Sequence, residues 1–99
     1  MREEESTLTI NKYGDKFWRN KKGKLHCIDG PAVEYWNGDK VWYQNGKRHR
    51  IDGPAAEHSN GKKLWYIRNK YFKTKDAFFE ALTPEEKEVA LFSEAFHNA

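Results

Sequence analysis

Hydrophobic residues in the first 73 positions come in short runs that turn-forming dipeptides separate. The runs are rich in tryptophan, tyrosine and β-branched residues, as is typical of strands. The run from Asp39 to Gln44 is the clearest, because Asn-Gly dipeptides flank it at 37–38 and 45–46. Asn-Gly accepts positive φ at both central positions of a type I′ turn, so this pattern predicts antiparallel hairpins.

The same pattern returns after 23 residues. Residues 23–43 align with residues 46–66 without a gap, and 14 of the 21 aligned positions are identical. Each copy contains Asp-Gly-Pro-Ala, and residues 13–18 resemble a third, degenerate copy. We expect each glycine of Asp-Gly-Pro to take a conformation closed to other residues, and each proline to fix φ where the next strand begins. The units are expected to build a twisted meander of roughly six to eight strands.

Helical signals begin after residue 73. Thr74 is a candidate N-cap for a helix over 74–82, with its apolar residues on one stripe. Thr-Pro-Glu-Glu at 83–86 has the capping box and the early proline of a helix start, which predicts a second helix to about Phe96. Val89, Phe92 and Phe96 are spaced to dock as one face. We expect this helix pair to cover one side of the sheet.

These patterns predict an α+β fold that is mostly β: an antiparallel meander of 23-residue hairpin repeats capped by two C-terminal helices. A chain of 99 residues is expected to form a single domain. Within it we expect a flexible N-terminus over 1–7, the repeat sheet over 8–73 and the helical cap over 74–97.

Composition narrows the class of protein. An aromatic content of 15% argues against disorder, although 33% of the residues are charged. The chain has no run of about 18 apolar residues and no apolar signal segment at its start, so no membrane association is expected. The single cysteine, Cys27, excludes an internal disulfide. We therefore expect a cytoplasmic protein.

The net charge of +3 hides an asymmetry along the chain. Residues 6–75 hold 16 Lys and Arg against 6 Asp and Glu, whereas residues 76–99 hold one Lys against six acids. A basic body of this kind suits an anionic partner, but lysines also line sheet edges to discourage edge pairing.

A family resemblance rests on the run Trp42–Ala55, which reads Trp-Tyr-Gln-Asn-Gly-Lys-Arg-His-Arg-Ile-Asp-Gly-Pro-Ala. It resembles the MORN-like repeat of many small proteins of tailed bacteriophages and giant viruses, over residues 13–72. The chain departs from the pattern at Cys27, where the second copy has Arg50, and at 21–22, where Asn-Gly is expected. The resemblance implies a non-enzymatic binding module in the host cytoplasm. It further implies a phage-encoded protein that binds and inhibits a host protein, such as a defence or CRISPR component.

Two histidines, His26 and His49, recur three residues before Asp29 and Asp52. A histidine near a carboxylate is the start of a general base or a metal site. No third ligand or nucleophile recurs with them, so a structural role is favoured. Glu34 and Glu57 are read as hydrogen-bond acceptors, and Cys27 and His26 face opposite ways as strand neighbours. We expect no enzymatic activity, no cofactor and no metal site.

Basic and aromatic residues interleave in the second copy. Tryptophan, tyrosine and arginine are enriched at protein-interface hot spots, which favours a protein-binding surface on an open sheet face. The alternative is single-stranded nucleic acid or a nucleotide, with bases stacked on rings and phosphates on cations. The candidate partner-binding residues are Trp36, Trp42, Tyr43, Lys47, Arg48, Arg50, Lys62, Lys63 and Arg68.

Overall fold

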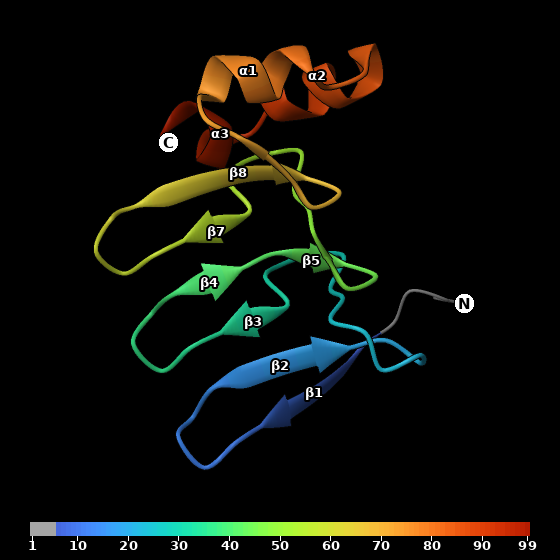
Figure 1. Cartoon of the computed structure of the whole chain (residues 1–99), viewed down its shortest axis with the longest axis vertical. Helices are drawn as coiled ribbons and strands as arrows, with labels where there is room; N and C mark the ends of the chain where they lie inside the picture. Colours follow the sequence, from blue (N-terminus) through green and yellow to red (C-terminus); the bar gives the residue numbers. More distant parts are fainter. Residues whose placement is uncertain (1–5) are drawn as a thin grey trace.

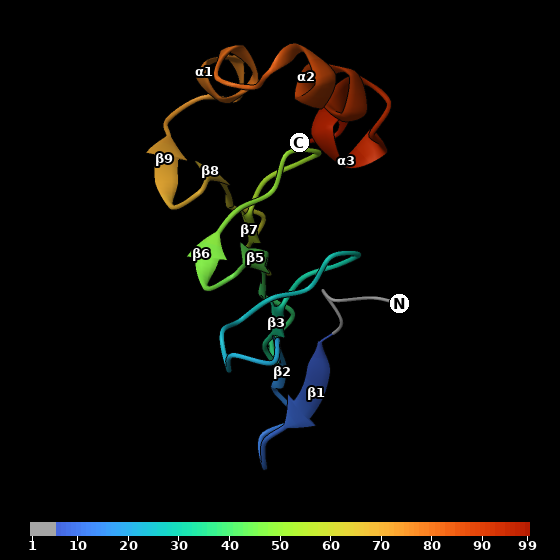
Figure 2. The same cartoon turned by 90° about the vertical axis from the view of Figure 1, so that its right-hand side faces the viewer.

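The computed structural model describes residues 6–99 and is mostly β. Seven strands form one antiparallel sheet in the order β1-β2-β3-β4-β7-β8-β9, and two more form a separate hairpin, β5-β6 (Figures 1 and 2). In sheet order the strands are β1 (Thr7–Ile10), β2 (Lys16–Arg19), β3 (Val33–Glu34), β4 (Lys40–Val41), β7 (Ala56–Glu57), β8 (Lys63–Ile67) and β9 (Lys70–Phe72). The separate hairpin consists of β5 (Tyr43–Gln44) and β6 (Lys47–Arg48). An antiparallel meander is thus confirmed.

The N-terminal boundary differs from the expected one. Residues 1–5 of the expected flexible segment 1–7 lie outside the described residues. Thr7 already belongs to β1, where it pairs with Arg19 of β2. The hydroxyl of Ser6 donates a hydrogen bond to the carbonyl of His26.

The expected single strand from Asp39 to Gln44 is divided between two sheets. β4 pairs within the large sheet, whereas β5 pairs only with β6. Trp42 stands at the division: its N–H donates to the carbonyl of Ala55 at 2.7 Å, and its own carbonyl accepts from the N–H of His49 at 3.1 Å. The chain therefore leaves the meander at Trp42, forms the β5-β6 hairpin and returns at β7.

The turns are of two kinds. Asn45 and Gly46 have φ values of 52° and 82°, so the predicted positive φ at both positions is confirmed there. At 37–38 only Gly38 has positive φ, and its N–H donates to the carbonyl of Tyr35 at 2.9 Å. This is a type I turn followed by a glycine bulge, so the type I′ prediction for 37–38 is wrong. The bulge glycine alone needs the left-handed region.

The Asp-Gly-Pro segments are not left-handed turns. Neither Gly30 nor Gly53 has positive φ, so the expected special conformation is wrong at both positions. The alanines that follow, Ala32 and Ala55, are fully buried and bonded into the ladder. The N–H of Ala55, for example, donates to the carbonyl of Leu64 at 2.8 Å.

Three short helices follow the sheet: α1 (Lys75–Glu80), α2 (Pro84–Leu91) and α3 (Glu94–His97). The predicted caps are confirmed, because Thr74 caps α1 and Thr83 forms a full capping box with Glu86 at the start of α2. The predicted second helix is interrupted at Ser93, whose hydroxyl caps α3 and donates to the carbonyl of Asp52 at 2.6 Å. None of the helices within residues 6–99 is long and apolar enough to span a membrane.

The helices lie at one end of the meander and do not cover a whole face of the sheet (Figure 1). Seen from the side, the sheet is a single layer beyond them (Figure 2). Phe96 docks as predicted, but Phe92 is 91% exposed and Val89 is also exposed, so their predicted docking is wrong. The main apolar core forms under the helices from Trp65, Ile67, Phe78, Leu82, Ala90 and Phe96.

Candidate binding surface

The turn of the β8-β9 hairpin is bonded to strand β6 of the β5-β6 hairpin. The N–H of Asn69 donates to the carbonyl of Arg48 at 2.8 Å, and the N–H of Arg48 donates to Oδ1 of Asn69 at 2.8 Å. Arg68 and Asn69 form the second turn with φ values of 48° and 73°, a left-handed pair without glycine. The backbone of Arg48 is thus fixed by its own hairpin and by the neighbouring one.

A cluster of one arginine and three tyrosines lies on these hairpins. Tyr43 pairs across the strands with Arg48, and Tyr66 pairs with Tyr71 at a ring separation of 5.5 Å. The guanidinium of Arg48 lies 5.2 Å from the Tyr66 ring centre, and its Nη1 donates to the Tyr66 hydroxyl at 3.2 Å. Hydrogen bonding to Tyr43 is the main cause that raises the pKa of Arg48. We call Tyr43, Arg48, Tyr66 and Tyr71 the tyrosine–arginine cluster.

The cluster is accessible to a partner. Arg48 is exposed, and the Tyr71 ring is 50% exposed. Because the contacts above already hold Arg48, a partner that binds it loses less side-chain entropy than with a free arginine. An exposed, preorganised arginine beside tyrosine rings has the composition of an interface hot spot.

The other side of the β5-β6 hairpin forms a small hollow. Gln44 and Lys47 are paired there, next to Tyr43 and Arg48 along each strand, and strand neighbours face opposite ways. The hollow has a volume of about 250 Å³ and contains two cations of the predicted set, Lys47 and Arg68. Lys47 and Arg48 therefore serve different surfaces, although they are adjacent in sequence.

The two recurring histidines have the same structural role. Nδ1 of His26 accepts the N–H of Asn45 at 2.9 Å, and Nδ1 of His49 accepts the N–H of Arg68 at 3.0 Å. Both amides belong to residues with positive φ, so each imidazole supports a strained hairpin turn. Burial, and secondarily the charge of Arg68, lower the pKa of His49. This supports the structural interpretation of the pair, since an accepting Nδ1 cannot carry a proton.

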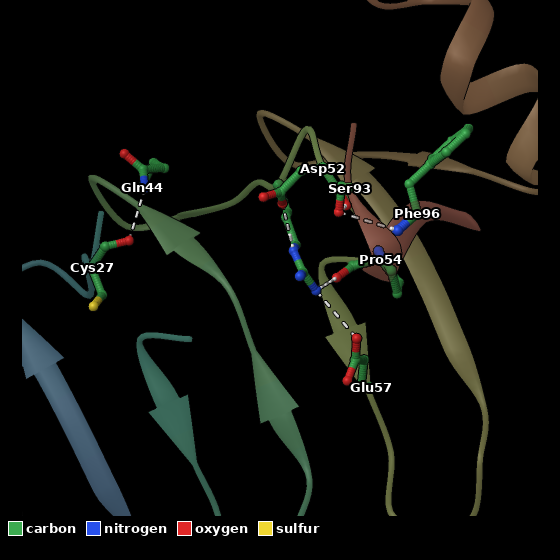
Figure 3. A network of polar contacts seen from close by, with 8 residues as sticks. Cys27, Gln44, Asp52, Pro54, Glu57, Ser93 and Phe96 are labelled. Atoms are coloured by element: carbon green, nitrogen blue, oxygen red, sulfur yellow. Dashed lines mark hydrogen bonds and ion pairs between the residues drawn. The ribbon is translucent and has the colours of Figure 1, made fainter. Parts of the chain in front are cut away.

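Arg50 lies inside the protein instead of on the open hairpins. Its Nε donates to Asp52 at 2.8 Å, and its Nη1 donates to the carbonyl of Pro54 at 3.1 Å and to Glu57 at 3.2 Å (Figure 3). The guanidinium also lies 3.9 Å from the ring centre of Trp42. With a side chain only 13% exposed, Arg50 joins the Asp-Gly-Pro segment to the sheet.

A larger cleft lies between the two Asp-Gly-Pro segments and helix α2. Its volume is about 590 Å³, and two residues of the predicted set, Trp42 and Arg50, line it. Apolar side chains of Ile28, Ile51 and Val89 form much of the remaining wall.

The remaining three predicted residues lie on the opposite margin of the sheet. Trp36 is in the β3-β4 turn and is 74% exposed, while its amide donates to Asp15 at 2.8 Å. Lys62 and Lys63 lie at the β7-β8 turn, on the same side of the molecule (Figure 1). The nine predicted residues thus do not form one surface.

Among residues 6–99, no three of the His, Cys, Asp and Glu side chains are grouped to hold a metal ion. Burial raises the pKa of Cys27, whose thiol contacts Asp29 at 3.4 Å, so thiolate formation is disfavoured.

Neither Tyr66 nor Tyr71 was predicted from the sequence as a binding residue. The signal was a turn at Arg68-Asn69, from which cross-strand pairing places Tyr66 opposite Tyr71. Residues without glycine rarely take positive φ, so this turn lacked the dipeptide that marked the others.

No protein-family model, curated protein or solved structure matches this chain.

Proposed function

We propose that this protein is a non-enzymatic binding module whose tyrosine–arginine cluster contacts an acidic surface of another protein. The observation that carries the proposal is the exposed guanidinium of Arg48, which two hairpins hold in place beside tyrosine rings. The excess of positive charge over residues 6–75 supports it, because a basic body speeds encounter with an acidic partner.

The resemblance to MORN-like phage repeats extends the proposal to the identity of the partner. On that ground we propose a host protein, such as a component of a defence or CRISPR system, which is inhibited when the module covers its functional surface. The guanidinium of Arg50 in the cleft beside Trp42 is already paired with Asp52 and Glu57, and the exposed Phe92 carries no charge.

The second candidate function is binding of single-stranded nucleic acid. It is favoured by one observation, the half-exposed Tyr71 ring beside Tyr66 and Arg48. Bases stack on such rings while cations neutralise phosphates, and this binding weakens steeply with salt.

Affinity purification from host extract, with and without nuclease treatment, tests the choice between the two. A protein partner is expected to remain after nuclease treatment and to be identified by mass spectrometry. Loss of every captured protein on nuclease treatment, together with salt-sensitive binding of a bare oligonucleotide, would replace the protein-binding proposal with the second one.

A further inference from the structure

The Arg50 network has an incomplete counterpart in the first copy of the repeat. Arg50 is held by Asp52, the carbonyl of Pro54, Glu57 and the ring of Trp42. At the corresponding positions the first copy keeps every group that holds the arginine, but it has a cysteine in place of the arginine. These first-copy residues are Trp18, Cys27, Asp29, Pro31 and Glu34.

The backbones of the two copies place these groups in the same way. The N–H of Trp18 donates to the carbonyl of Ala32 at 2.8 Å, and its carbonyl accepts from the N–H of His26 at 3.0 Å. Trp42 makes the corresponding two bonds at 2.7 and 3.1 Å. These shared backbone hydrogen bonds identify Trp18 as the structural counterpart of Trp42.

The two glutamates are also equivalent in register. Glu34 pairs with Lys16 on one side and Lys40 on the other. Glu57 pairs with Lys40 and Lys63 in the same manner.

Among residues 6–99, the Asp29 and Glu34 carboxylates of the first copy form no ion pair. In the second copy Asp52 and Glu57 share the guanidinium of Arg50. Within residues 6–99, Asp29 has only the Cys27 thiol at 3.4 Å, and Glu34 makes no ion pair. Two acidic side chains that the fold places as in the arginine network are therefore left with unused acceptor capacity.

The first copy also has room where the second is filled. A methyl group added at Gly53 would lie 2.8 Å from Cζ of Arg50 and 3.1 Å from Cβ of Ala95. The same addition at Gly30 meets no described atom within 4 Å. Asp29, Gly30 and Pro31 also line the 590 Å³ cleft, so this edge of the first copy borders an open cleft.

We propose that Trp18, Asp29, Glu34 and the carbonyl of Pro31 form a binding site for the guanidinium group of an arginine side chain that another protein supplies. The bound guanidinium takes the place that Arg50 has in the second copy, stacked on tryptophan and bonded to two carboxylates. Paired carboxylates and a tryptophan face suit the planar, charged guanidinium better than a lysine ammonium. This site goes beyond the proposed function, because it is acidic and contains no residue of the tyrosine–arginine cluster.

The site is tested by titrating the full chain with N-acetyl-arginine methylamide. Binding is measured by the chemical shifts in ¹H–¹⁵N NMR spectra. Saturable shifts are expected at the Trp18 indole and at the amides around Ala32 and Glu34, with a dissociation constant in the millimolar range. The citrulline analogue has the same shape without the charge and is expected to cause no such shifts. Absence of saturable shifts with the arginine probe, or equal shifts with the citrulline probe, would overturn the proposal.

Two variants complete the test. Glu34→Gln is expected to weaken binding of the arginine probe about tenfold, because the guanidinium then meets a neutral acceptor in place of a carboxylate. Cys27→Arg is expected to fill the site from within, to raise the melting temperature and to abolish binding of the probe. If Glu34→Gln binds the probe as well as the unmodified protein does, the site is not the one proposed. This conclusion holds even if Cys27→Arg fails to fold, and neither result depends on the macromolecular partner of the tyrosine–arginine cluster.

Discussion

Replacing Arg50 by alanine is expected to remove a large part of the stability of the protein. The change leaves the buried carbonyl of Pro54 without its donor, which costs about 1–3 kcal/mol. The contact with Trp42 contributes about 1 kcal/mol, in line with a partly buried cation–π pair. Asp52 and Glu57 are 46% and 30% exposed, so water replaces the lost ion pairs and they add only about 1 kcal/mol together. The sum is about 3–5 kcal/mol, against a typical total of about 5–15 kcal/mol.

Urea denaturation followed by tryptophan fluorescence measures this loss, with thermal melting as a second readout. For a domain of this size the melting temperature should fall by roughly 12 °C or more, since 1 kcal/mol corresponds to about 4–8 °C. Arg50→Lys keeps the charge without the forked geometry and is expected to lose an intermediate amount.

Arg48→Ala is the matched control, because Arg48 is two residues away and exposed. It is expected to cost less than about 1 kcal/mol, as surface contacts do. If Arg50→Ala and Arg48→Ala were destabilised equally, Arg50 would not be the internal joint described above.

Two further predictions concern the same region. The folded protein holds His49 neutral because its Nδ1 accepts the N–H of Arg68, and its pKa is lowered. The unfolded state therefore binds more protons, so stability should fall as the pH drops below 6.5, the ordinary pKa of histidine. The variant His49→Gln should show a smaller fall in the urea midpoint between about pH 7 and pH 5. A fall of equal size in both proteins would show that His49 does not carry this dependence. Gly53→Ala should cost about 1–3 kcal/mol in urea denaturation through the clash with Arg50, while Gly30→Ala, in open space, should be nearly neutral. Equal costs for the two glycines would contradict the described packing.

Local signals in the sequence predicted much of the fold. The caps at Thr74 and Thr83 were recognisable because capping uses side chains within a few residues of the helix start. The turn at 45–46 was recognisable for the same reason, since Asn-Gly carries its own conformational preference. These elements depend on short stretches of chain and not on what packs against them.

Features that depend on distant contacts were not predictable in this way. The pattern over 39–44 reads as one strand, but Trp42 is bonded to Ala55 and His49 and the chain changes sheets there. The break before α3 depends on Ser93, which bonds to Asp52, 41 residues away in sequence. Local periodicity contains no information on such partners.

The candidate site was predicted only in part. Residue type alone predicted both Arg48 and Arg50 as partner-binding residues. In the structure Arg48 is exposed beside tyrosine rings, whereas Arg50 is enclosed by carboxylates. Because side chains alternate along a strand, Lys47 and Arg48 face opposite sides of the hairpin. This difference could be inferred only after the pairing of β5 with β6 was known. The repeat itself was informative in another way, because it identifies Cys27 as the replaced arginine position.

The most direct test of the proposed function compares Arg48→Glu with Lys47→Glu. Both variants change the charge equally at adjacent positions of one hairpin, but only Arg48 belongs to the tyrosine–arginine cluster. The measurement is the affinity of each variant for the partner captured from host extract, by biolayer interferometry at two salt concentrations. Arg48→Glu is expected to weaken binding by more than about 2 kcal/mol, as loss of a hot spot does, and Lys47→Glu by much less. Equal affinity of the two variants for that partner would contradict the assignment of the cluster as the binding surface.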